Sequence, residues 1–143
     1  TLGYTSIKFK RKDVWGLLTR IDSPFAGKQY IEASDLIGQP LLCSEQSFRR
    51  NEFDGWLNDL RAELNIVGTF NLLYNAYVLA TAGVGHVLAL DGIINPTAAS
   101  GLVWLPLYPR LECDIAIAWN RSRNLSPASK RLISLLKEEE AKI

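Results

Sequence analysis

Residues 40–90 alternate short apolar runs with helix-like segments, and this alternation limits the possible folds more than any other feature of the chain. The runs PLLC (40–43), IVGTF (66–70) and HVLAL (86–90) have the length and apolar character of buried strands. Strands that alternate with helices form parallel sheets whose faces the helices cover. The segment therefore predicts a β-α-β-α-β unit of the α/β class.

The two intervals between these strands carry different helix signals. In the first interval, apolar side chains recur at helical spacing and form one stripe: Phe53, Trp56, Leu57, Leu60 and Leu64. In the second, Asn71 is placed to cap a helix over residues 72–82, and Gly83 is placed to end it. One helix is expected in each interval.

The segments on either side add strands and a last helix. Strand character is expected in four further segments: 4–9, 14–20, 102–109 and 113–121. A single helical turn is expected to end at Gly38. Ser126 and Pro127 are typical first residues of a helix. Its expected buried stripe comprises Ala128, Leu132, Leu135 and Leu136.

Composition excludes several classes of protein. The 143 residues are 48% hydrophobic and 22% charged, which is typical of a single domain with a real core. A formal net charge of +1 provides no basic face for nucleic acid. The longest apolar run, 77–90, is too short and too interrupted by glycine to span a bilayer. An N-terminus without an apolar signal segment, and Cys43 and Cys113 without CxxC spacing, indicate a cytoplasmic protein with reduced thiols.

Signals of catalysis or cofactor binding are missing from the sequence. It has no G-x-S-x-G, Walker-type or H-E-x-x-H motif, and the GVG at 83–85 follows a helix instead of a strand. For His86, the only histidine, a structural and partly buried role is favoured over a catalytic one. No group of His, Cys, Asp or Glu has the spacing of metal ligands. We therefore expect a protein that is not an enzyme, with no cofactor and no metal.

Small polar side chains gather where the predicted parallel strands end, which is where ligands bind in open α/β sheets. They are Ser44, Gln46, Ser47, Thr69, Asn71 and Asp91, and all of them except Asp91 are candidate site residues. Thr69 and Asn71 could instead have structural roles, at the end of the strand and as the cap of the helix.

Two arginines, Arg49 and Arg50, lie near the start of the predicted helix that follows, where the helix dipole disfavours cations. Either one of them faces an anion or both are solvated, and these alternatives stay open. If an anion binds, we expect Arg49 to supply the charge and Arg50 to matter less.

Four segments, taken in order, resemble the effector-binding domain of LysR-type transcriptional regulators. They are KDVWGLLTRIDSPFAGKQYI (12–31), DLIGQPLLCSEQ (35–46), FNLLYNAYVLATAGVGHVLAL (70–90) and LVWLPLYPRLECDIAIAWNRSRNLSPASKRLISLL (102–136). Phe25 stands where the family usually has leucine. The resemblance implies a lobe like those of type 2 periplasmic binding proteins, with a mostly parallel sheet and an antiparallel return strand. It places a second lobe at 9–108 and the returning strand and helix of a first lobe at 110–143.

The resemblance also implies a function. A small-molecule effector, anionic if an arginine contacts it, would lie in a cleft between lobes against Ser44, Gln46, Ser47, Arg49, Thr69 and Asn71. Effector binding would control DNA binding by a separate N-terminal helix-turn-helix, and most of the first lobe would precede this segment. The full-length protein would be a homo-oligomer that binds DNA only through that separate domain and does not contact a membrane.

Three other functions remain possible from the sequence. One is a solute-binding protein of the same fold. Another is a small α/β hydrolase that uses Ser44 or Ser47, although no base is in evidence. The third is a redox sensor that uses Cys43.

Overall fold

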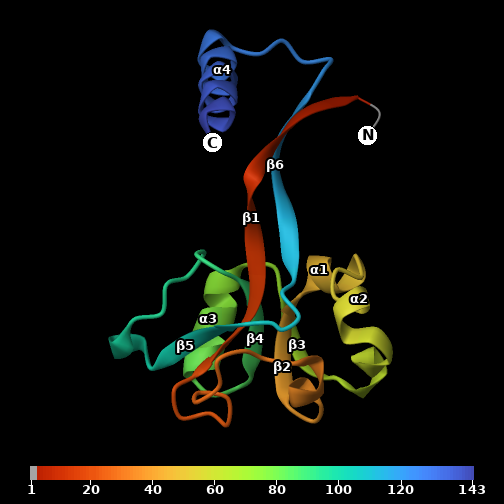
Figure 1. The fold of residues 1–143 in the computed structure, drawn as a ribbon, viewed down its shortest axis with the longest axis vertical. Coiled ribbons are helices and arrows are strands. Elements are labelled where there is room, and N and C mark those ends of the chain that lie inside the picture. The colour runs from red at the N-terminus through yellow and green to blue at the C-terminus, as the bar shows by residue number, and fades with distance from the viewer. Residues whose placement is uncertain (1–2) are drawn as a thin grey trace. The chain divides into compact units, whose positions relative to one another are not determined.

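The computed structural model describes residues 3–143 and contains two compact units (Figure 1). The larger unit is Val14–Glu112, and the smaller one combines the described residues up to Asp13 with Cys113–Ile143. The strands are β1 (Tyr4–Arg20), β2 (Pro40–Ser44), β3 (Asn65–Phe70), β4 (His86–Leu90), β5 (Leu102–Pro106) and β6 (Glu112–Asn120). The helices are α1 (Glu45–Arg49), α2 (Asp54–Leu57), α3 (Leu73–Thr81) and α4 (Pro127–Lys142), with short 3₁₀ helices η1 (Ala33–Leu36), η2 (Asn58–Glu63) and η3 (Ala98–Ser100).

The sheet has the strand order β3-β2-β4-β1-β5, and β6 pairs with β1 outside this path. Strand β2 is parallel to both β3 and β4. Strand β1 is antiparallel to both β4 and β5, so β2, β3, β4 and β5 all run in one direction. The predicted α/β class is confirmed, and the sheet is mixed: along this path two strand pairs are parallel and two, both made by β1, are antiparallel. The two strand segments expected at 4–9 and 14–20 form one continuous strand.

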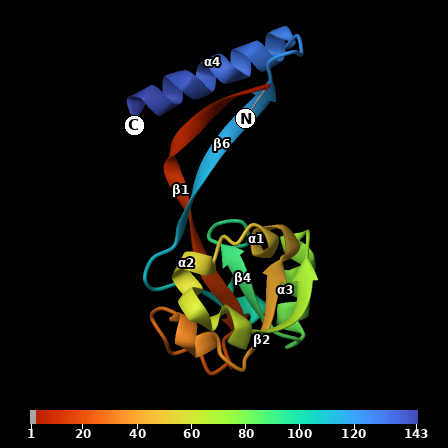
Figure 2. The ribbon, with the colours of Figure 1, turned by 90° about the vertical axis from the view of Figure 1, so that its right-hand side faces the viewer.

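The core of the larger unit lies on both faces of the sheet, because successive side chains of a strand point to opposite faces. On one face, Trp15 and Leu88 pack with Phe53 of the α2 segment. On the other face, Leu42 and Val87 pack against Ala76 of α3, among others. Figure 2 shows α2 and α3 on opposite sides of the strands. The continuous apolar character of β2 and β4 follows from this burial on both faces.

The first predicted helix is broken in the structure. Phe53, Trp56 and Leu57 are buried as expected. However, helix α2 ends at Leu57, and the chain continues as η2. Asn58 at the junction has a φ of 51°, a left-handed conformation that an α-helix cannot contain. The apolar spacing therefore predicted the buried face correctly and the continuity of the helix wrongly.

The start of α3 also differs from the prediction. The helix begins at Leu73, and its N-cap is Leu72, which makes no side-chain capping bond. Asn71 is therefore not the cap, and its amide is available for other contacts. Gly83, with a φ of 80°, follows the last turn as predicted.

In the smaller unit, α4 begins as predicted but does not bury the predicted stripe. The Ser126 hydroxyl accepts a hydrogen bond from the Ser129 backbone at 3.1 Å, and Pro127 is the first helical residue. Ala128, Leu132 and Leu135 are exposed, and Leu136 is only partly buried. An amphipathic pattern identifies the apolar side of a helix, but burial of that side requires a second surface.

Candidate functional site

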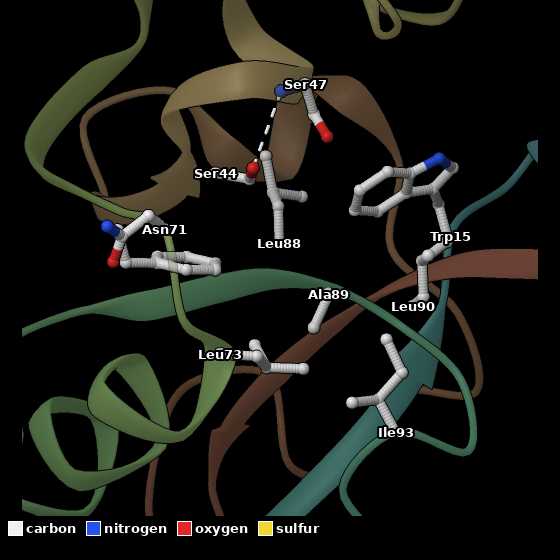
Figure 3. A pocket seen from close by; sticks show the side chains of 10 residues that line it. Trp15, Ser44, Ser47, Asn71, Leu73, Leu88, Ala89, Leu90 and Ile93 are labelled. Carbon is white, nitrogen blue, oxygen red and sulfur yellow. Dashed lines mark hydrogen bonds between the residues drawn. The ribbon is translucent and has the colours of Figure 1, made fainter. Parts of the chain in front are cut away.

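A hollow of about 160 Å³ lies at the carboxyl end of β2, β3 and β4 (Figure 3). We call it the apolar hollow, and it is lined by Trp15, Ser44, Ser47, Phe70, Asn71, Leu73, Leu88, Ala89, Leu90 and Ile93. These residues come from strands β1 to β4, from the first residues of helices α1 and α3, from the corner after β3 and from the loop after β4. Ligands of open α/β sheets bind at this edge.

A second hollow, of about 320 Å³, adjoins the first. We call it the polar hollow, and it is lined by Ser44, Glu45, Gln46, Arg49, Arg50 and Asn71. Ser44 and Asn71 line both hollows. The loop after β2 and the corner after β3 therefore converge on one place, as the sequence predicted.

The segment after β2 is helix α1, and a capping hydrogen bond fixes its first turn. Ser44 is the last residue of β2 and the N-cap of α1, and its hydroxyl accepts a bond from the Ser47 backbone at 3.4 Å. In Figure 3 the Ser47 side chain extends into the space between Leu88 and Trp15. The end of β2 and the first turn of α1 thus each present one hydroxyl group to the hollows.

Arg61 holds helix α1 and the residues that follow it in place through several side-chain contacts. Its guanidinium donates to the Phe48 carbonyl at 2.7 Å and to the Asn51 side chain at 2.8 Å, and it also pairs with Asp54. It lies 4.2 Å from the centre of the Phe48 ring. These contacts connect α1 to α2 and hold in place the loop that carries the candidate residues.

The corner after β3 contributes Asn71 but not Thr69. The side chains of β3 alternate between exposed and packed faces, and Thr69 lies on the exposed face next to Phe70. Thr69 is not among the residues that line either hollow. The Asn71 amide has no hydrogen-bond partner among the described residues, and both hollows border it.

The two arginines have different surroundings. Arg49 donates to Glu45 at 2.7 Å within α1, and its side chain is 77% exposed. The Arg50 guanidinium lies against the Gln46 amide, whose oxygen can accept from it at 2.8 Å. Among the described residues, Arg50 has no carboxylate partner. The carboxylate partner of Arg49 was not predicted from the sequence.

Cys43 is unsuited to redox chemistry in this structure. It is fully buried in the core, and this burial raises the pKa of its thiol to about 11. At neutral pH the thiol therefore keeps its proton, whereas the reactive form of cysteine is the thiolate. Cys43 and Cys113 form no disulfide, and Cys113 is only partly buried.

His86 is placed away from the candidate serines. It pairs with Leu41 across the sheet, and Ser44 lies three residues further along β2, roughly 10 Å away. Its Nδ1 lies 2.7 Å from the Thr19 hydroxyl, which in turn donates to Ser23 at 2.8 Å. Because Thr19 donates to Ser23, the imidazole donates to Thr19. His86 is therefore a structural histidine, and it does not supply the base that a hydrolase would need.

The environment of His86 predicts a pH dependence of stability. Partial burial lowers the pKa of His86 below its ordinary value of 6.5. The unfolded chain thus binds a proton more readily than the folded protein, so the free energy of unfolding should fall as the pH decreases through about 6.5. Urea denaturation at about pH 7.5 and about pH 5.5 measures this loss. In His86→Gln, which cannot titrate, the difference between the two pH values should shrink, and an unchanged difference would contradict the assignment.

The described residues offer neither a metal site nor a membrane-spanning helix. Within residues 3–143, no three side chains of His, Cys, Asp or Glu are grouped so that they could hold a metal ion. Of the helices in this part of the chain, none combines the length and the apolar character needed to cross a membrane.

Comparison with known proteins identifies the fold. Residues 9–141 match the family model described as LysR substrate binding domain. The structure is similar to the effector binding domain of QuiR in complex with shikimate, with a TM-score of 0.80, 17% identity, and coverage of 98% of this chain and 66% of that one. It is also similar to the CcmR regulatory domain of Synechocystis PCC6803 in complex with 2-PG, with a TM-score of 0.74, 16% identity, and coverage of 96% and 67%.

A third similar structure is that of HinK, a LysR family transcriptional regulator from Pseudomonas aeruginosa, with a TM-score of 0.76 and 16% identity. The alignment covers 97% of this chain and 48% of HinK, so the chain spans about half of that protein's length. A search of curated protein sequences found no match. The family model covers nearly the whole chain and agrees with the resemblance carried by the four sequence segments. The chain therefore belongs to the LysR substrate binding domain family.

Proposed function

We propose that this chain senses a small-molecule effector, which binds where the apolar and polar hollows meet. Ser44, Ser47 and Asn71 supply hydrogen bonds to the effector, and Gln46 and Arg49 form the rim of the site. The observation that carries this proposal is that Ser44 and Asn71, from the ends of two adjacent parallel strands, line both hollows. We leave Thr69 outside the site because it lies on the exposed face of β3.

The nature of the scaffold supports this assignment. The strands under the hollows are buried, so the groups at their ends are held in place without a ligand. The side chains in the hollows include hydrogen-bonding groups but no nucleophile with a base, which suits binding better than catalysis. The similar domains of QuiR and CcmR were solved in complex with the small molecules shikimate and 2-PG, respectively.

In the full-length protein, we propose that effector binding changes the activity of a separate N-terminal DNA-binding domain. Binding acts by shifting the balance between arrangements of the domain. In this proposal residues 9–108 form the second lobe, and 110–143 form the returning strand and helix of the first. The full-length regulator is cytoplasmic and homo-oligomeric, it is not an enzyme, and it reaches DNA only through the N-terminal domain.

The substitution Asn71→Ala tests the site. A screen of small polar metabolites by thermal shift should first find compounds that raise the melting temperature of the chain. Loss of one neutral hydrogen bond costs about 0.5–1.5 kcal/mol, so Asn71→Ala should weaken their binding roughly three- to ten-fold, as measured by calorimetry.

Asn75→Ala is the matched control, because Asn75 is an exposed asparagine of α3 that lines neither hollow. It should bind the same compounds as the unmodified chain does. If Asn71→Ala and Asn75→Ala bind them equally well, the effector site lies elsewhere.

A further inference from the structure

The two hollows differ in chemistry although they share a border. Seven of the ten residues that line the apolar hollow are apolar, and all six that line the polar hollow carry a polar or charged side chain. Ser44 and Asn71 stand at the border. One ligand that fills both spaces therefore needs an apolar part and a polar part that are directly joined.

The size of the apolar hollow limits the apolar part. Its volume is about 160 Å³, and an apolar protein cavity of about 150 Å³ is known to hold one benzene molecule. A single six-membered ring therefore fits this hollow.

Three of the residues that line the apolar hollow are buried in the sheet. Leu88 and Ala89 are buried in β4, and Trp15 is buried against Phe53 with ring centres 4.7 Å apart. Ile93, from the loop after β4, also lines the hollow and is 59% exposed. A ring can enter past Ile93 and pack on a surface that already exists in the absence of a ligand.

The polar hollow carries one positive charge that nothing in the described chain balances. Two arginines and one glutamate line it. The glutamate, Glu45, is paired with Arg49, which leaves the guanidinium of Arg50 with only the neutral Gln46 amide beside it. A carboxylate or similar group on a ligand would find its charged partner in Arg50, and the Arg49–Glu45 pair would contribute little net charge.

From these features, and resting on the effector site proposed above, we infer the chemical class of the ligand. It is a small molecule with one apolar or mostly apolar six-membered ring and one anionic group. The ring occupies the apolar hollow between Trp15, Leu88 and Ile93. The anionic group lies in the polar hollow and accepts hydrogen bonds from Arg50 and from the Asn71 amide.

Three probes separate the parts of this inference: benzoate has both the ring and the charge, benzamide has the ring without the charge, and acetate has the charge without the ring. Calorimetry on the 143-residue chain should show saturable binding of benzoate. A charge-assisted hydrogen bond makes a difference of roughly ten- to a hundred-fold in affinity, so benzamide should bind that much more weakly. Acetate should show no saturable binding.

The substitution Arg50→Gln tests the anion contact. It should remove the preference for benzoate over benzamide and leave the affinity for benzamide within about two-fold. Arg123→Gln, at an exposed loop position in the smaller unit, makes the same change in net charge and should preserve the preference. The double variant Glu45→Gln with Arg49→Gln removes the ion pair without a change in net charge, and it should still prefer benzoate.

The substitution Ile93→Ser tests the ring contact. Loss of this apolar wall should lower the affinity for benzoate and the affinity for benzamide by the same factor, roughly three- to ten-fold. Ile21→Ser is the matched control, because Ile21 is 58% exposed and does not line the apolar hollow. It should leave both affinities unchanged.

The outcomes distinguish the ligand class from the site itself. Equal binding of benzoate and benzamide, or a preference that survives Arg50→Gln, would overturn the anionic assignment. Binding of acetate as tight as that of benzoate would overturn the ring assignment, and failure of benzoate to bind would overturn both. In each of these cases the proposed site would still stand if Asn71→Ala weakens the binding of the compounds found in the thermal-shift screen and Asn75→Ala does not.

Discussion

Gly16→Ala is expected to destabilise the protein by about 3 kcal/mol or more. Gly16 lies in β1 between Ala89 of β4 and Pro106 of β5. A Cβ atom at this position would overlap the ring of Trp104 and would lie 2.6 Å from the Leu105 carbonyl oxygen. The Trp104 ring cannot easily move, because its Nε1 donates to the Ala89 carbonyl at 3.1 Å.

The loss is large compared with the total stability of a small domain, which is about 5–15 kcal/mol. Urea denaturation measures it. Gly55→Ala is the control, because a Cβ there meets no atom within 4 Å and the residue lies within α2. This change should be neutral or stabilise by about 0.4–1 kcal/mol. If both variants have the same midpoint, the close packing of β1 against β5 is not as described.

The second large effect is expected for Phe53→Ala, with a loss of about 3–5 kcal/mol. Phe53 is almost fully buried, and its ring meets the Trp15 ring edge to face at an interplanar angle of 65°. The substitution leaves a cavity behind Trp15, which is one wall of the apolar hollow. A reduced melting temperature and unfolding at lower urea concentration should both be observed.

Phe53→Leu separates the effect on the hollow from the effect on folding. It keeps most of the buried volume and should cost less than Phe53→Ala. Because Trp15 loses its ring contact, benzoate should still bind more weakly to Phe53→Leu than to the unmodified chain under conditions where both are folded. Unchanged binding would show that the position of Trp15 does not depend on Phe53.

The secondary structure could be predicted where the signal is local. The runs 40–43, 66–70 and 86–90 are short, apolar and bounded by turn residues, and each lies within one of the strands β2, β3 and β4. The caps at Ser126 and Gly83 were also correct, because a cap depends on the few residues around it.

Predictions failed where they depended on packing. The stripe from Phe53 to Leu64 has helical spacing, yet the left-handed Asn58 divides it into α2 and η2. The stripe of α4 has no buried residue, because spacing cannot show which surface covers it. Asn71 was predicted to be the N-cap of α3, but the observed N-cap is Leu72, one residue later. The result is an unbonded amide at the border of the two hollows.

Most of the polar residues of the candidate site could be predicted from the sequence. Ser44, Gln46, Ser47, Arg49 and Asn71 come directly after predicted strands, and parallel strands bring their carboxyl ends to one edge. The apolar half could not be predicted. Trp15 reaches it only because β1 inserts antiparallel between β4 and β5, and Ile93 reaches it from a loop with no distinctive sequence pattern.

The order of amino acids thus determined which segments become strands and which polar groups stand at their ends, because both depend on neighbours in the chain. The tertiary structure alone decided which apolar side chains face those groups. The contacts of the two arginines are local by comparison, because Glu45 lies four residues before Arg49 in α1 and Gln46 lies four residues before Arg50. Strand order and side-chain direction settle which strands and loops meet at the hollows, and both arise from the burial of the two faces of the sheet.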